Sequence, residues 1–254
     1  MDFLASPAFW IALGQIIIID ILLGGDNAVV IALACRKLPP AQRTKGIIWG
    51  TAGAIVLRVI LIAFAMTLLA LPFLKFVGAL LLVWIGVKLL APDEDGHGDV
   101  QGSDKLLAAI KTIIVADLVM SVDNVIAIAG AAQNAGEHQF LLVVLGLLIS
   151  IPIIVWGSQL VIKLMERFPM IITLGGMLLG WIAGGMLVTD PAFVNPAIVD
   201  WMPKWGGVDD KGMAVIPDTL YWASHIVGAL LVLAVGKLVL SRRAAAAGPA
   251  EQQG

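Results

Sequence analysis

The sequence predicts an all-α, polytopic membrane protein with seven transmembrane helices. Of its 254 residues, 60% are hydrophobic and only 13% are charged, whereas an average soluble domain is about 45–50% apolar and about 25% charged. The mean hydropathy is +0.98, and the apolar residues gather in runs of about 20, the length that a helix needs to cross a bilayer. A repeat of the chain at a shift of 97 residues predicts how these helices are arranged.

The seven predicted spans follow the apolar runs in order. They cover about 9–34, 46–70, 72–91, 105–132, 139–162, 169–189 and 218–240. Pro72 and Pro169 stand at span starts, where a helix loses nothing by their missing N–H. The N-terminus lacks the positive region of a cleaved signal peptide, so we expect the first run to remain a membrane helix. With one cysteine, Cys35, no intrachain disulfide is expected.

The segments between the spans divide the chain further. We expect residues 1–91 to form a first three-helix repeat and residues 105–189 a second, inverted one, with a polar cytoplasmic linker at 92–104 between them. Residues 190–217 are a predicted extracytoplasmic loop, 218–243 a seventh transmembrane helix and 244–254 a disordered tail.

The distribution of lysine and arginine predicts the orientation. Twelve of these residues flank the connections after the first, third and fifth spans or lie at the C-terminal end of the last span. Only Lys75, Lys204 and Lys211 lie on the opposite side. We therefore expect a cytoplasmic C-terminus and an N-terminus outside. The net charge of −2 gives no indication of nucleic-acid binding.

An acidic motif occurs twice within these apolar runs. The segment Asp20–Asn27 recurs as Asp117–Asn124, each with an Asp followed six residues later by Asp-Asn. An Asp at the centre of a membrane helix costs about 2.5–3.5 kcal/mol on the insertion scale, so an ionisable residue there indicates a functional site. A purely structural alternative, in which these side chains join helices, would need only a single Asn at much lower cost.

The 97-residue shift that aligns the motifs also aligns Pro72 with Pro169 and Trp84 with Trp181. Each repeat holds three spans, an odd number, so the second copy must enter the membrane from the opposite face. In transporters with such inverted repeats, the site lies near the midplane at the repeat interface. We therefore expect Asp20 and Asp117 to meet centrally, with Asp26 towards the cytoplasm and Asp123 towards the outside.

The side chains of the two motifs predict a cation site. Carboxylates, amides and a hydroxyl are hard oxygen ligands, which suit Mn²⁺, Ca²⁺ or Mg²⁺. Gly24-Gly25 favours a local break in the first motif, because glycine disfavours a helix interior by about 1 kcal/mol; Ser121 stands at the matching place in the second. The predicted metal ligands are Asp20, Asp26, Asn27, Asp117, Ser121, Asp123 and Asn124.

Arg58, near the middle of the second predicted span, is a candidate counter-ion for these carboxylates. It would pair with an ionised Asp when the cation is absent. The alternative is that its guanidinium satisfies a backbone carbonyl.

The two motifs, GGDNAVVIA and SVDNVIAIA, each led by an earlier Asp, resemble those of the TerC family of bacterial integral membrane proteins, which is named for tellurite resistance. The resemblance covers about residues 5–240, and the short form of the chain is similar to the family's YjbE-like branch. It implies a link to the LysE superfamily of exporters, a bacterial inner-membrane location, and manganese efflux or metal supply to exported enzymes. It also implies that the family's acidic motif residues correspond to Asp20, Asp26, Asn27, Asp117, Asp123 and Asn124.

These observations predict a secondary transporter, not an enzyme, that exports a divalent metal and carries no prosthetic group. The resemblance implies manganese rather than Ca²⁺ or Mg²⁺, and proton antiport is a sub-hypothesis for the driving force. The expected partners are the metal ion and the lipid bilayer, and a second copy of the chain in a homodimer is a further candidate partner. The alternative function is a membrane scaffold that delivers metal to the secretion machinery or to exported metalloproteins, or supports tellurite or metal stress resistance, without transport of its own.

Overall fold

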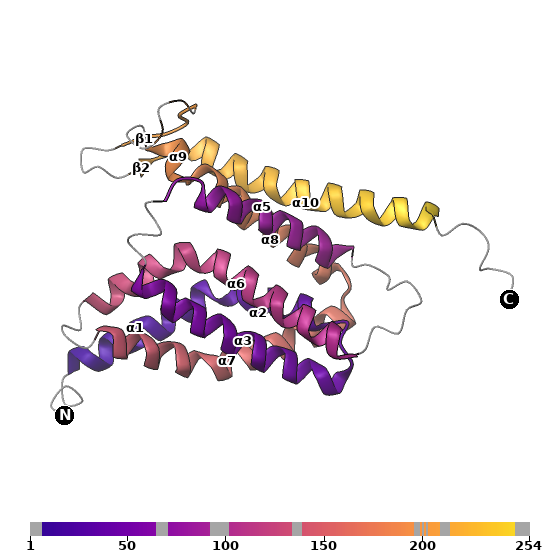
Figure 1. The fold of residues 1–254 in the computed structure, drawn as a ribbon, viewed down its shortest axis with the longest axis horizontal. Helices are drawn as coiled ribbons and strands as arrows, with labels where there is room; N and C mark the ends of the chain where they lie inside the picture. Colours follow the sequence, from indigo (N-terminus) through magenta and orange to yellow (C-terminus); the bar gives the residue numbers. More distant parts are fainter. Residues whose placement is uncertain are drawn as a thin grey trace, which may run out of the picture. The chain divides into compact units, whose positions relative to one another are not determined.

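The computed structural model describes residues 7–64, 71–91, 102–133, 139–195, 199, 201, 203–208 and 214–246. These residues form helices almost throughout (Figure 1). The helices are α1 (Pro7–Leu23), α2 (Gly25–Cys35), α3 (Pro40–Ala63), α5 (Leu74–Leu90), α6 (Gly102–Gln133), α7 (Gln139–Arg167), α8 (Met170–Val188), α9 (Pro191–Val194) and α10 (Asp218–Ala246), and two short strands are β1 (Gly207–Val208) and β2 (Ala214–Val215).

The chain divides into two compact units. Unit 1 comprises Met1–Leu74 and Asp99–Phe168, and unit 2 comprises Lys75–Gly98 and Pro169–Gly254. The α-helical class that the sequence predicts is confirmed. Of the described helices, α3, α7, α8 and α10 are each long and apolar enough to cross a membrane, and α1 with α2 makes a fifth candidate if the bent pair counts as one span.

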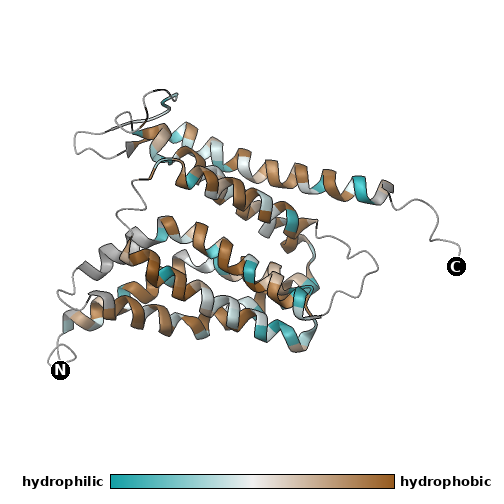
Figure 2. Cartoon of the chain, viewed as in Figure 1, coloured by the Kyte–Doolittle hydropathy of each residue, from teal (hydrophilic) through white to brown (hydrophobic). Residues whose placement is uncertain are grey.

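The outward faces of these helices are apolar. Trp49 and Val56 of α3, Trp156 of α7 and Trp222 of α10 expose 55–68% of their surface, and Figure 2 shows hydrophobic residues along most of each helix. In water such surfaces would be a liability, whereas a bilayer solvates them. The outward apolar side chains are therefore those expected of helices that face lipid.

Unit 1 is held together by close helix contacts around two glycines of α3. A Cβ atom at Gly50 would lie 2.6 Å from Ile113 of α6, and one at Gly53 would lie 2.5 Å from Ile114. The absence of side chains at these two positions lets α3 and α6 approach closely. On its other side α3 joins an apolar cluster with α1 and α7, in which Ile55 packs with residues such as Ile16 and Leu147.

The first acidic motif lies across a break between two helices. α1 ends at Leu23 and α2 begins at Gly25, with a bend of 47° between their axes. Gly24 forms the junction, and a Cβ atom there would lie only 2.4 Å from the carbonyl oxygen of Asp20. The break falls where the glycine pair predicts it. By contrast, α6 continues without interruption through Ser121 in the second motif.

Unit 2 contains a tightly packed helix pair, α8 and α10. Cβ atoms at Gly180 and Gly184 would lie 2.3 Å and 2.0 Å from the backbone oxygens of Gly228 and Ser224. Small residues four apart on one helix face let two membrane helices touch along their backbones. This contact accounts for the glycine-rich sequence of α8.

The predicted loop at 190–217 has a folded start. The side chain of Asp190 caps α9 by accepting from the Ala192 N–H at 2.8 Å. The Lys204 ammonium donates to the carbonyls of Ala192 and Asn195 at 3.0 and 3.1 Å. Most of the predicted linker, at 92–101, and the tail from residue 247 lie outside the described residues, while α10 continues through the alanines to Ala246.

Candidate functional site

Three helices of unit 1 bring buried charges together. Asp20 comes from the last turn of α1, Arg58 from α3 and Asp117 from α6. The Arg58 guanidinium lies between the two carboxylates, because Nη1 donates to Asp20 and Nη2 to Asp117. The three residues are 1%, 2% and 7% exposed. The two aspartates that the repeat predicts to meet are thus close together, and Arg58 pairs with both.

Two serines complete the hydrogen bonds of these carboxylates. Ser121, one turn beyond Asp117, accepts from Nε of Arg58 at 3.0 Å and donates to Asp117 at 3.0 Å. Ser150 of α7 donates to the second oxygen of Asp20. Each carboxylate is therefore bound by one guanidinium N–H and one serine hydroxyl. We call these five residues the Arg58 cluster.

The Arg58 cluster is stabilised by pairing within a site that excludes solvent. Removing one partner of such a buried ion pair typically costs about 3–5 kcal/mol, because the remaining charge is left uncompensated. Two carboxylates therefore pair with one guanidinium, so the cluster carries one excess negative charge when both are ionised.

The other residues of the first motif lie on the far side of the break. Asp26, in the first turn of α2, accepts from the backbone N–H of Asn27 at 2.8 Å. The Asn27 side chain is 4% exposed, and neither its Oδ1 nor its Nδ2 has a hydrogen-bond partner among the described residues. A buried polar group left without a partner costs about 1–3 kcal/mol. Asn27 is therefore an amide with unused ligand capacity close to the cluster.

The break does not release the carbonyls at its edges. The Asp20 carbonyl still accepts from the Gly24 N–H at 2.7 Å, and the Gly24 carbonyl accepts from the Ala28 N–H at 3.3 Å. These two carbonyl groups thus stay within helical hydrogen bonds, and the polar groups presented by the first motif are side chains.

The second motif is described in part. Asp123 and Asn124 follow Ser121 in α6, but the side chain of Asp123 lies outside the described residues. Asn124 is half-buried. Within the described part of the chain, no three His, Cys, Asp or Glu side chains group closely enough to hold a metal ion. In this arrangement the space between Asp20 and Asp117 holds the guanidinium of Arg58.

Three buried polar residues in the described part of unit 1, Thr51, Ser150 and Ser158, have no counterpart in the sequence prediction. Ser150 binds Asp20, and Thr51 of α3 is 2% exposed with no partner for its hydroxyl among the described residues. Serine and threonine are common in membrane helices, where they usually bond to a carbonyl of the preceding turn. Residue type alone therefore gave no signal. The seven-residue spacing from Thr51 to Arg58, which places both on one helix face, was the only available hint.

Comparisons with known proteins agree with this picture of a membrane protein. The Integral membrane protein TerC family matches residues 5–245. The chain is 45% identical over 182 residues to "Uncharacterized membrane protein YjbE" of Bacillus subtilis (strain 168), which covers 72% of this chain and 81% of that protein. It is 26% identical over 189 residues to "UPF0053 inner membrane protein YgdQ" of Escherichia coli (strain K12), covering 65% and 75% of the two chains. No solved structure matches the chain. The chain belongs to the TerC family of integral membrane proteins.

Proposed function

We propose that this protein is a secondary transporter, and not an enzyme, that exports a divalent metal cation, manganese, through the Arg58 cluster. One observation carries the proposal: a positively charged side chain lies between two buried carboxylates on different helices. Arg58 acts as a built-in counter-ion that holds the empty site together. A metal ion takes its place between Asp20 and Asp117 when it binds.

The charge balance of the site favours a divalent ion. The structure pairs Asp20 and Asp117 with Arg58. The proposed site adds Asp26, six residues after Asp20, so three negative charges stand against one positive charge and leave an excess of two. One M²⁺ ion or two protons would neutralise that excess. A site that alternates between these occupants couples metal export to proton entry without a prosthetic group or ATP.

The available ligands are hard oxygen donors. Besides the carboxylates, the hydroxyls of Ser121 and Ser150 lie in the cluster, and the Asn27 amide is unpaired among the described residues. Such ligands suit Mn²⁺, Ca²⁺ and Mg²⁺ rather than soft metals. The choice of manganese rests on the family resemblance. Asp123 and Asn124 would serve the ion on the other side of the cluster.

The proposed architecture is seven spans in a bacterial inner membrane, with the N-terminus outside and the C-terminus in the cytoplasm. It is supported by helix at each of the seven apolar ranges and by the lysine and arginine distribution. The two three-helix halves would form an inverted repeat with its axis near the cluster. The break at Gly24 is a natural hinge, because interrupted helices at the midplane are typical of such transporters.

The test is Mn²⁺ flux into or out of proteoliposomes that contain the purified protein, with a proton gradient applied. We expect Asp20→Asn and Asp117→Asn to abolish the flux. Asp104→Asn, which changes an exposed carboxyl in the first turn of α6, is the matched control and should leave it intact. Equal flux through all four proteins would refute the proposal.

A further inference from the structure

Thr51 has an unusual hydroxyl for a buried threonine in a helix. Other hydroxyls in the described helices donate to a carbonyl of the preceding turn, as buried Ser158 does to Ile154 and the partly exposed Thr112 does to Ala108. The Thr51 Oγ1 has no partner among the described residues, although its side chain is 98% buried. Because buried polar groups are almost always satisfied, an orphaned one indicates a place for water or an ion.

The position of Thr51 follows from two contacts between α3 and α7. Near the start of α3, Arg43 pairs with Glu166 at the end of α7. Near the other end, Arg58 of α3 and Ser150 of α7 both bind Asp20. The two helices are therefore antiparallel between these contacts.

Thr51 lies about two turns along α3 from Arg43 and about two turns from Arg58. On α7, Ser158 lies about two turns from Glu166 and about two turns from Ser150. Both are fully buried. At a rise of about 1.5 Å per residue, each is roughly 10–12 Å from either end. Thr51 and Ser158 therefore occupy the same level, midway between the surface pair and the cluster.

A third polar side chain reaches this region from α2. Asn27 is seven residues beyond Asp20. The Cβ atom of its neighbour Ala28 would lie 3.9 Å from a Cβ atom placed on Gly157 of α7. This contact puts the first turn of α2, which holds Asn27, at the level of Ser158 on α7, and the Asn27 amide is also unpaired among the described residues. Three helices each place a buried polar side chain between the surface pair and the Arg58 cluster.

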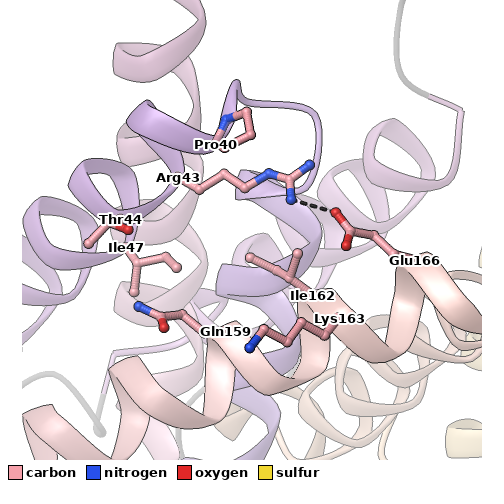
Figure 3. Close-up of a pocket in the computed structure, with 8 residues that line it drawn as sticks. All are labelled: Pro40, Arg43, Thr44, Ile47, Gln159, Ile162, Lys163 and Glu166. Carbon is pink, nitrogen blue, oxygen red and sulfur yellow. Dashed lines mark hydrogen bonds and ion pairs between the residues drawn. The ribbon is translucent and has the colours of Figure 1, made fainter.

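A pocket opens where this line of polar residues meets the surface. It has a volume of about 190 Å³ and lies between the start of α3 and the end of α7 (Figure 3). Thr44 and Gln159 line it, together with the Arg43–Glu166 pair. Thr44, Thr51 and Arg58 follow one another at intervals of seven residues, so they share one face of α3. The pocket therefore lies at the N-terminal end of the α3 face that carries Thr44, Thr51 and Arg58.

We propose that Thr51, Ser158 and Asn27 line a hydrated passage from this pocket to the Arg58 cluster, with Thr51 as the intermediate oxygen site for a divalent cation. The identity of the cargo rests on the proposed function; the hydration of the passage does not. The Thr51 hydroxyl and the Asn27 amide oxygen replace water molecules around the ion halfway between the surface and the cluster.

The passage is tested by the reactivity of an introduced thiol. In a Cys35→Ala background, Thr51→Cys is exposed in proteoliposomes to a small cationic methanethiosulfonate reagent. Ile55→Cys, one turn further along α3 and packed in the apolar cluster, is the matched control. We expect Thr51→Cys to react at least tenfold faster than Ile55→Cys. Equal rates would mean that Thr51 lies in a dry core, and would overturn the proposal.

A second variant tests the hydroxyl itself. Thr51→Val keeps the shape of the side chain, and because the hydroxyl has no described partner, the melting temperature should stay equal or rise. Mn²⁺ flux should fall about tenfold, while Thr112→Val should leave it unchanged. Unaltered flux in Thr51→Val would remove Thr51 as an ion site. If the wild-type protein carries no Mn²⁺ at all, the proposed function fails, and thiol reactivity still decides whether the passage is hydrated.

Discussion

Replacing Arg58 by methionine should make the protein bind Mn²⁺ more tightly and transport it more slowly. Arg58 makes three charge-assisted hydrogen bonds, to Asp20, Asp117 and Ser121. A bound metal ion has to displace at least one of them before it reaches the carboxylates. Arg58→Met removes this competition and also removes the group that would push the ion out again.

The size of the effect follows from those bonds. A hydrogen bond to a charged group contributes about 1.5–3 kcal/mol, and about 1.4 kcal/mol is a tenfold change in affinity. Losing one such competitor should lower the Kd for Mn²⁺ by about 10- to 150-fold. Without metal, the variant should be about 3–5 kcal/mol less stable than the wild type, because two buried carboxylates lose their partner. Mn²⁺ at a hundred times its Kd should restore about 2.7 kcal/mol.

The assay is the melting temperature of detergent-purified protein over a Mn²⁺ titration, with Kd from isothermal titration calorimetry. Arg43→Met is the matched control, because Arg43 pairs with Glu166 far from the cluster in the same unit. We expect its Mn²⁺ affinity to equal that of the wild type. An Arg58→Met protein that folds but binds Mn²⁺ no more tightly than the wild type would show that Arg58 does not compete with the metal.

Three further predictions concern stability. Ser150→Ala should lower the unfolding free energy in a denaturation assay by about 1.5–3 kcal/mol, because Asp20 loses a charge-assisted hydrogen bond. Ser158→Ala removes only a bond to its own helix, so in the same assay it should lower the unfolding free energy by less than about 1.5 kcal/mol. Gly184→Ala should lower the unfolding free energy by about 1–3 kcal/mol, since its Cβ would lie 2.0 Å from the Ser224 carbonyl oxygen. Gly14→Ala, with open space around it, should be neutral or stabilising. Equal melting temperatures for the two variants would argue against the close packing of α8 on α10. Lys204→Met should make the segment after α9 more sensitive to limited proteolysis, because the carbonyls of Ala192, Asn195 and Val199 lose their ammonium donor. An unchanged cleavage pattern would contradict that role.

The sequence predicted the cluster where its residues carry a high cost in a membrane. Asp20, Asp117 and Arg58 are expensive in apolar helices, so each had to have a partner or a function, and the structure pairs all three. The break at Gly24 was predictable for a similar reason, because two adjacent glycines weaken a helix that carries an acidic motif.

The remaining parts of the site depend on contacts that residue type does not reveal. Ser150 is one of several serines and threonines in the helices, and only the packing of α7 beside α1 places it on Asp20. Thr51 stands out only because its hydroxyl lacks the usual bond to its own helix within the described structure. The α8–α10 contact did leave a signal, Gly180 and Gly184 four residues apart, which predicts a close helix interface once a partner helix is known.

The most direct test of a metal site in the Arg58 cluster is a structure with Mn²⁺ bound, determined with anomalous scattering at the manganese edge. We expect one anomalous peak coordinated by Asp20 and Asp117, at distances below the roughly 2.3–2.6 Å of Ca²⁺–oxygen bonds, with the Arg58 guanidinium withdrawn from both carboxylates. A peak elsewhere in the protein, with Arg58 still bound to Asp20 and Asp117, would show that the cluster is a structural ion pair and that the metal binds at another site.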